Sequence, residues 1–301
     1  MISLQEMLKA GIEKLTKTSN KSYVSLQPNF LIPGSGRAGS TFLYSCLKQH
    51  PEIFFSTIKE PSYFSKYYDL GDEWYLKHFK ARKNYSRVGE ASTQYFYTIK
   101  AAKRIFDFNP DFRLIFIIRN PVIRAYSNYT REIQLWGENR PFEEVLTESK
   151  RYVWPAMYYT HLSRFLEYFP KEQLYVIIFE KFIKQIDFYL AEICKFLDIN
   201  PNFRFNQEKF TRNPSKMPIN THLQKLNRNL FQLNRREPYF MQVFRVGGRT
   251  VVNSINHLFY KAREFPQMKK STRNYLMDYF YDEIIKLEEL LKEDLSIWKN
   301  K

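Results

Sequence analysis

The sequence predicts an α/β fold with a central parallel sheet and helices on both faces. Short apolar strands alternate with amphipathic helices along most of the chain, an order that favours parallel strands joined by crossover helices. The clearest strand lies at 112–120, where the near-continuous apolar run of FRLIFIIRN is typical of a strand buried on both faces. A further indication is the glycine-rich turn after residues 30–32, which leads from a strand into a helix.

The remaining elements follow from apolar spacing. Strands are expected to end at residue 32 and to cover 52–55, the start of 87–92, 112–120 and 173–180. Helices are expected from residue 40 onward and over 72–79, 98–108, 121–136, 157–169, 182–199 and 271–295. Pro121 suits the first position of its helix. Residues 1–27 are interpreted as an amphipathic N-terminal extension and residues 28–301 as a single domain, in which the polar and basic segment 200–265 is irregular.

The composition indicates a sizeable core and an anionic partner. The chain has 301 residues, of which 44% are hydrophobic, and its 47 Lys and Arg against 31 Asp and Glu give a net charge of +16. The two cysteines show no zinc or disulfide spacing and the five histidines are scattered, so no metal site is predicted. Because no signal peptide or apolar run of about 18 residues is found, a cytoplasmic location is expected. Residues 1–20 either pack on the domain or make a weak peripheral membrane contact.

The loop GSGRAGST, residues 34–41, predicts an anion site. It holds three of the nine glycines of the chain, and its place before a helix directs free N–H groups and the positive end of the helix dipole to one point. The spacing is close to the P-loop pattern G-x-x-x-x-G-K-[ST], which narrows the fold to a P-loop-like three-layer α/β/α architecture. Ser40 stands at the lysine position of that pattern, and Arg37 is the cation of the loop.

Three further stretches carry candidate functional residues. In KEPSYF, Pro61 favours an extended conformation for Glu60, so Lys59 and Glu60 are expected to project from a loop. In IIRNPVIRAYSNY, Arg119 closes an apolar strand and needs a partner, and Ser127 follows about two helical turns into the next helix. This stretch predicts a second anion site. In KAREFP, Lys261 and Arg263 precede the final helix, and this signal is the least specific of the three.

Together these motifs resemble those of the sulfotransferases that use 3′-phosphoadenosine 5′-phosphosulfate (PAPS). The likeness is to the branch containing heparan sulfate 3-O- and N-sulfotransferases and their bacterial relatives, and it runs from about residue 28 to the C-terminus. GSGRAGSTFL is similar to the 5′-phosphosulfate loop of that family, KEPSYF to its Lys-Glu-Pro segment, and IIRNPVIRAYSNY to its 3′-phosphate motif. KAREFP resembles a cofactor loop of the family, with Ala262 in place of a glycine.

The resemblance implies a role for each residue. Residues of the loop would bind the 5′-phosphosulfate: Arg37, Ala38, Gly39, Ser40 and Thr41. Arg119 and Ser127 would bind the 3′-phosphate, and Lys261 and Arg263 would complete the cofactor site. Glu60 would act as general base, assisted by Lys59 and Arg37. The implied reaction moves a sulfuryl group from PAPS to a hydroxyl or amine of a glycan or another alcohol, releases 3′-phosphoadenosine 5′-phosphate (PAP), and requires no metal.

Two alternatives remain open from the residues. A P-loop kinase acting on a small metabolite would have a lysine at position 40 and an acidic Mg²⁺ ligand after the strand at 112–120, which instead ends in Arg119 and Asn120. A non-catalytic protein that binds an anionic glycan would use the same positive charge without needing Glu60. No nucleic-acid-binding module is found, so a nucleic acid is not expected as a partner.

Overall fold

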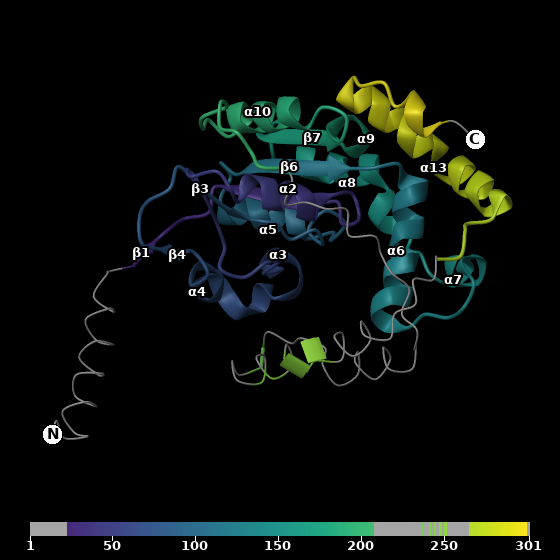
Figure 1. Cartoon of the computed structure of the whole chain (residues 1–301), viewed down its shortest axis with the longest axis horizontal. Coiled ribbons are helices and arrows are strands. Elements are labelled where there is room, and N and C mark those ends of the chain that lie inside the picture. Colours follow the sequence, from purple (N-terminus) through teal and green to yellow (C-terminus); the bar gives the residue numbers. More distant parts are fainter. Residues whose placement is uncertain are drawn as a thin grey trace.

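The computed structural model describes residues 23–207, 236–237, 241, 244, 247–248, 250–251 and 265–299. Within these residues, a five-stranded sheet has the order β3-β5-β2-β6-β7 and every neighbouring pair is parallel (Figure 1). The strands are β2 (Phe30–Gly34), β3 (Ile53–Phe55), β5 (Arg87–Glu90), β6 (Arg113–Ile118) and β7 (Leu174–Ile178). The predicted central parallel sheet is confirmed.

Helices cover both faces of this sheet. Alternate residues of its central strand β6 therefore belong to two separate hydrophobic cores, one on each face. Leu114, Phe116 and Ile118 of β6 belong to one core, and Ile115 and Ile117 belong to the other. The first core includes residues of α3 (Tyr63–Lys66), α4 (Gly71–Leu76), α5 (Ala101–Phe108), α6 (Pro121–Trp136), α7 (Phe142–Glu148), α8 (Tyr158–Leu166) and α13 (Lys270–Leu291). The second includes residues of α2 (Ser40–Leu47), α9 (Phe179–Phe182) and α10 (Ile186–Phe196). The predicted three-layer architecture is therefore confirmed.

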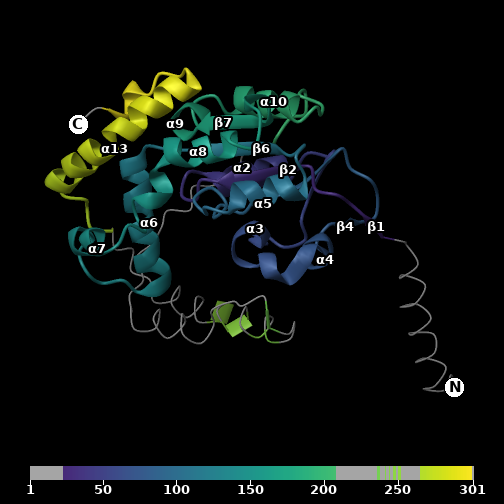
Figure 2. The same cartoon turned by 180° about the vertical axis from the view of Figure 1, so that it is seen from behind.

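The helix that follows the central strand keeps the predicted bounds for local reasons. Helix α6 begins at Pro121, and the Asn120 side chain accepts hydrogen bonds from the backbone N–H groups of Val122 and Ile123. It ends before Gly137, whose φ of 66° places it in the left-handed region. Figure 2 shows α13 passing beside α6 and α8 at one end of the molecule. Short elements complete this part: η1 (Tyr68–Leu70), η2 (Trp154–Ala156), η3 (Lys171–Gln173) and η4 (Ser296–Trp298).

Small elements mark the start of the described chain. Strand β1 (Val24–Ser25) pairs antiparallel with β4 (Lys80–Ala81), and Leu26 is buried in the first core. The amphipathic helix predicted at residues 1–20 and most of the irregular segment 200–265 lie outside the described residues. Among the helices that the structure describes, none has the length and apolar character to cross a bilayer.

The parallel arrangement collects the predicted functional segments at one edge of the sheet. Because all five strands run the same way, their carboxyl ends meet there, which is the ligand-binding edge of open α/β folds. The loops that follow β2, β3, β5, β6 and β7 begin at residues 35, 56, 91, 119 and 179. Arg37, Glu60 and Arg119 are thus brought to one edge, although they lie far apart in the sequence.

Candidate active site

The glycine-rich loop joins β2 to α2 and is shaped by close packing. Gly39 is the N-cap residue of α2 and has a φ of 95°, and a Cβ at this position would lie 2.6 Å from the Phe179 ring. A Cβ at Gly34 would lie 2.6 Å from the Cβ of Phe96. Ala38 is fully buried in the second core, so its methyl group packs inside the protein and does not face the loop's open side. The loop is therefore fixed from behind, and the first N–H groups of α2 have no acceptor within the helix.

Four arginines surround this loop. Burial lowers the pKa of Arg37 to about 10, and the positive charges of Arg131, Arg124 and Arg119 add to the effect. Arg124 is itself buried and donates to the backbone carbonyls of Gly36 (3.2 Å) and Tyr152 (3.3 Å), so it holds the loop in place. Charges of one sign gathered at a partly buried site favour an anion that would neutralise them.

The two segments predicted to form anion sites lie in direct contact. The side chain of Arg37 donates from Nε to the Ser127 hydroxyl at 3.0 Å, so the loop after β2 touches helix α6. Arg119, at the end of β6, places its guanidinium over the Phe179 ring at 5.1 Å, with its Nε 4.0 Å from a carboxylate oxygen of Glu180. The buried Nε of Arg119 has no hydrogen-bond acceptor among the described residues. We call the loop 34–41 with Arg119 and Ser127 the donor site.

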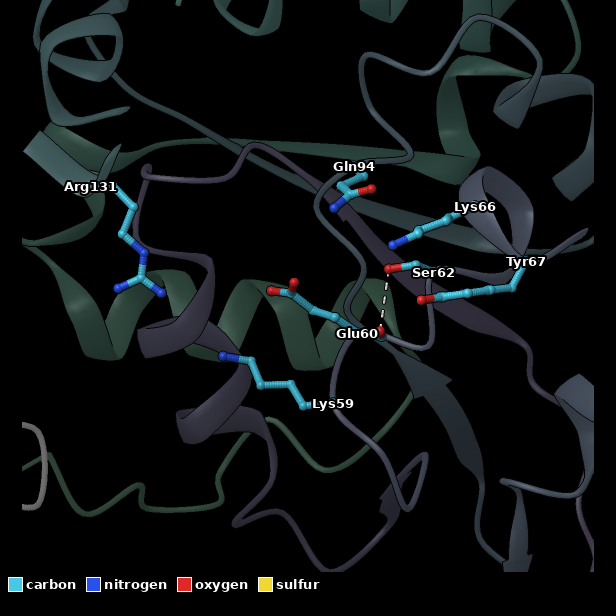
Figure 3. Close-up of a pocket in the computed structure, with 7 residues that line it drawn as sticks. All are labelled: Lys59, Glu60, Ser62, Lys66, Tyr67, Gln94 and Arg131. Atoms are coloured by element: carbon cyan, nitrogen blue, oxygen red, sulfur yellow. Dashed lines mark hydrogen bonds between the residues drawn. The ribbon is translucent and has the colours of Figure 1, made fainter. Parts of the chain in front are cut away.

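A cavity of about 370 Å³ adjoins the donor site and contains the predicted base (Figure 3). Its lining, which we call the acceptor pocket, consists of Lys59, Glu60, Ser62, Lys66, Tyr67, Gln94 and Arg131. Figure 3 shows the Glu60 carboxylate pointing into the space bounded by Arg131, Lys59 and Lys66. Lys59 also donates to the Thr41 hydroxyl at 2.9 Å, which connects the pocket to the glycine-rich loop.

The extended conformation predicted for Glu60 from the following Pro61 is wrong, because hydrogen bonds of the folded loop hold it in a different and unusual backbone conformation. Glu60 has a φ of 52° and Ser62 a φ of 57°, both in the left-handed region that costs energy for residues other than glycine. The backbone N–H of Ser62 donates to the Ser92 hydroxyl at 2.9 Å, and the Ser62 hydroxyl donates to the Glu60 carbonyl at 3.2 Å. These bonds anchor the loop to the segment after β5 and direct Glu60 towards the pocket.

A second carboxyl group lies beneath this loop. Glu90, the last residue of β5, is fully buried, and neither of its oxygens makes a hydrogen bond of standard geometry to a described residue. Burial raises the pKa of Glu90 to about 7, and the charge of Glu60 raises it further, against the nearby hydroxyls of Tyr95, Ser92 and Tyr75, which lower it. Glu90 was not singled out from the sequence, where it reads as an ordinary strand residue.

A comparison with known protein families shows which family has this sequence pattern. Residues 27–238 match a family described as "Sulfotransferase domain". The chain belongs to the sulfotransferase family.

Curated sulfotransferases of animals resemble the chain over much of its length. It is 27% identical over 287 residues to the bifunctional heparan sulfate N-deacetylase/N-sulfotransferase 4 of Mus musculus, an alignment that covers 88% of this chain and 30% of that protein. It is 28% identical over 196 residues to the heparan sulfate glucosamine 3-O-sulfotransferase 3B1 of Homo sapiens, covering 60% of this chain and 50% of that protein. The chain thus spans between 30% and 50% of the length of these relatives.

Solved sulfotransferase structures share the fold. A sulfotransferase from Alicyclobacillus acidocaldarius superposes with a TM-score of 0.69 at 22% identity, covering 91% of this chain and all of that one. Mouse sulfotransferase SULT7A1, solved in complex with PAP, superposes with a TM-score of 0.50 at 14% identity, covering 88% of each chain. These identities are low, and the likeness establishes the architecture.

The sulfotransferase fold brings together most of the residues predicted from the sequence. Arg37, Ser127 and Arg119 share the donor site, and Lys59 and Glu60 face the adjoining pocket. Lys261 and Arg263 lie outside the described residues, so their assignment to the cofactor stays a prediction. Among residues 23–207 and 265–299, no three His, Cys, Asp or Glu side chains gather in a way that could hold a metal ion.

The structure places further side chains beside the predicted residues. Arg131 reads in the sequence as an ordinary surface arginine, yet it lines the acceptor pocket and its charge helps to lower the pKa of Arg37. Its position four residues after Ser127, on the same helix face, was the available signal. Lys66, Tyr67 and Gln94 also line the pocket and lie in stretches without a distinctive motif.

Proposed function

We propose that this protein transfers a sulfuryl group from PAPS to a hydroxyl or amine of an anionic acceptor, with Glu60 as the general base. The observation that carries the proposal is the arrangement of four arginines around a glycine-rich loop, with one carboxylate facing the adjoining pocket. A phosphate-bearing donor suits the arginines and the start of α2, and a proton acceptor suits the pocket beside them.

The donor site fits a nucleotide with anionic groups at two positions. The N–H groups at Gly39, Ser40 and Thr41, together with Arg37, bind the 5′-phosphosulfate end, with Ala38 contributing through its backbone. Arg119 and Ser127 bind the 3′-phosphate, which distinguishes this donor from ATP, and Lys261 and Arg263 complete the site. The positive cluster supports this assignment, because burial and the neighbouring positive charges lower the pKa of Arg37, and a bound anion would offset both.

Sulfuryl transfer needs a base on one side and charge stabilisation on the other. Glu60 accepts the proton of the acceptor as the new bond to sulfur forms, and Lys59 stabilises the sulfuryl oxygens. Arg37 and the loop N–H groups stabilise the negative charge that grows on the phosphate as the sulfur–oxygen bond breaks and its electron pair leaves with PAP. In this proposal the fixed cations perform the task that Mg²⁺ performs in P-loop kinases.

The acceptor pocket favours a polar, negatively charged acceptor. Lys59, Lys66 and Arg131 supply positive charge, Gln94 supplies an amide, and Tyr67 supplies an aromatic surface. Such a lining suits a sugar that carries sulfate or carboxylate groups. The similarity to enzymes named for heparan sulfate supports a glycan as the acceptor class.

The decisive experiment is calorimetric titration of the protein with PAP in the presence of EDTA. We expect binding by the wild type, strong weakening in Arg119→Ala, and unchanged binding in Glu60→Gln, which lacks the base and keeps the donor site. Transfer of labelled sulfate from PAPS to a sulfated or carboxylated glycan should be lost in Glu60→Gln. Binding of ATP with Mg²⁺ in place of PAP would establish the kinase alternative. Glycan binding that is equal in wild type and Glu60→Gln, without transfer by either, would establish the non-catalytic alternative.

A further inference from the structure

The corner between β7 and α9 contacts both halves of the donor site. Phe179, the first residue of α9, packs so closely on Gly39 that a Cβ there would lie 2.6 Å from its ring. The same ring carries the Arg119 guanidinium at 5.1 Å. One aromatic side chain therefore supports the start of α2 on one side and the proposed 3′-phosphate ligand on the other.

The next residue, Glu180, connects three separate parts of the molecule. Its Oε1 accepts from the backbone N–H of Asn120 at 2.9 Å and lies 4.0 Å from the Nε of Arg119. Its Oε2 accepts from the indole Nε1–H of Trp298 at 3.0 Å. Trp298 is fully buried in η4, close to the end of the chain. The carboxylate is thus fixed through both oxygens.

This fixed carboxylate supplies a negative charge beside Arg119. Arg119 is one of three arginines whose positive charge acts on Arg37, and its buried Nε makes no hydrogen bond to the described residues. A side chain in this position would turn towards solvent unless a negative charge and a packing surface held it. Glu180 supplies the charge, Phe179 supplies the surface, and Trp298 keeps Glu180 from swinging away.

We propose that Glu180, held by Trp298, is a positioning residue that orients Arg119 for the 3′-phosphate, so that the turn near the C-terminus takes part in nucleotide selection. This inference rests on the proposed donor site. It predicts that removal of the Glu180 carboxylate weakens PAP binding, whereas charge repulsion alone predicts tighter binding. A carboxylate that acted only through its charge would repel the phosphate, so its removal would tighten binding, whereas removal of a positioning group weakens it.

The test compares two nucleotides that differ by the 3′-phosphate, PAP and adenosine 5′-phosphate, by calorimetry on the full-length chain. We expect Glu180→Gln to weaken PAP binding about tenfold and to leave adenosine 5′-phosphate binding unchanged. Trp298→Phe keeps a buried ring and removes the indole donor, so a smaller loss in the same direction is expected. Glu293→Gln is the matched control, because Glu293 pairs with Lys181 of α9 at 2.6 Å and is absent from the donor site. It should bind both nucleotides as the wild type does.

A double-mutant cycle separates positioning from general damage. If Glu180 acts through Arg119, the variant Arg119→Ala with Glu180→Gln should bind PAP no worse than Arg119→Ala alone. Unchanged or tighter PAP binding by Glu180→Gln, or equal losses for both nucleotides, would overturn the inference while leaving the donor site intact. Failure of the wild type to bind PAP would instead overturn the proposed function, and this inference with it. If Glu180→Gln is unfolded at the assay temperature, the Trp298→Phe result decides.

Discussion

The donor site and the acceptor pocket are neighbours, yet they are constructed differently. Donor-site residues are supported from behind: Arg124 holds Gly36, Phe179 packs on Gly39, and Ala38 is buried in the core. The pocket has Ser62 and Tyr67 as buried lining residues, but Lys59, Lys66 and Gln94 in its lining are exposed at the surface. A supported site tolerates few substitutions, whereas exposed side chains can change without loss of the fold. The difference suits the proposed function, in which one kind of donor is bound at a firmly supported site.

The largest expected effect tests whether the pocket is where chemistry occurs. We expect Glu60→Gln to reduce the sulfate-transfer rate about 10³-fold, since a positioned general base contributes about 10²–10⁴-fold, and to leave PAP affinity unchanged. The measurement is kcat with labelled PAPS at saturating acceptor. Glu293→Gln, an exposed change outside both sites, serves as the control. Retained activity in Glu60→Gln would show that another residue is the base. It would also contradict the assignment of donor binding to one region and proton removal to the other.

A pair of glycines tests how rigid the donor site is. Gly39 and Gly71 both have positive φ values, 95° and 77°, but a Cβ at Gly71 would meet nothing within 4 Å. We expect Gly71→Ala to cost about 1 kcal/mol from backbone strain alone, and Gly39→Ala to cost about 3 kcal/mol because the new methyl also collides with Phe179. Urea unfolding measures both. PAP binding should weaken in Gly39→Ala and be unaffected in Gly71→Ala, and equal costs would show that the loop can relax.

The sequence revealed these two regions unequally. Arg37, Arg119 and Ser127 belong to contiguous motifs in which a strand, a glycine-rich turn and a helix start are all local features, so they could be predicted. Glu180 could not, because its role depends on which segments meet at the sheet edge. For Arg131 the sequence indicates a shared helix face with Ser127, but it does not indicate that Arg131 lines the pocket. The strand predicted at 173–180 ends at Ile178 in the structure. Phe179–Phe182 form a separate turn of helix there, and the helix predicted from 182 begins at Ile186.

The buried Glu90 beneath the pocket is expected to make the stability of the protein depend on pH. Its folded-state pKa of about 7 exceeds the ordinary value of 4.5, so the folded protein binds the proton more tightly than the unfolded chain. Its contribution to stability is therefore fully present below pH 4.5 and is lost as the pH rises through 7. We expect Glu90→Gln to be more stable than the wild type above pH 7, by up to about 3 kcal/mol, with the difference shrinking towards pH 4.5.

Urea unfolding of both proteins at a series of pH values tests this expectation. Glu52→Gln is the control, because Glu52 is a half-buried glutamate near the opposite end of β5, where it accepts hydrogen bonds from the Ser86 hydroxyl and the backbone N–H of Asn200. A constant difference between Glu90→Gln and the wild type at all pH values would mean that Glu90 does not titrate in this range. The outcome also bears on the proposed catalysis, because the negative charge of an ionised Glu90 would repel the carboxylate of Glu60.

The smallest expected effect concerns the charge of the pocket and separates it from the donor site. We expect Lys66→Ala to raise the acceptor KM about fivefold to tenfold through the loss of one charge-assisted contact, with PAP affinity unchanged. Lys77→Ala is the matched control, since Lys77 also lies against an aromatic ring, that of Trp74, but is absent from the pocket. The effect of Lys66→Ala should shrink as salt rises from about 50 to about 300 mM, because exposed charges are screened over about 10 Å or less.

Arg131→Ala should have a different effect, because Arg131 lines the pocket and its charge also acts on Arg37 of the donor site. If Arg131→Ala changes acceptor KM and PAP affinity together while Lys66→Ala changes acceptor KM alone, the boundary between the two regions runs through Arg131.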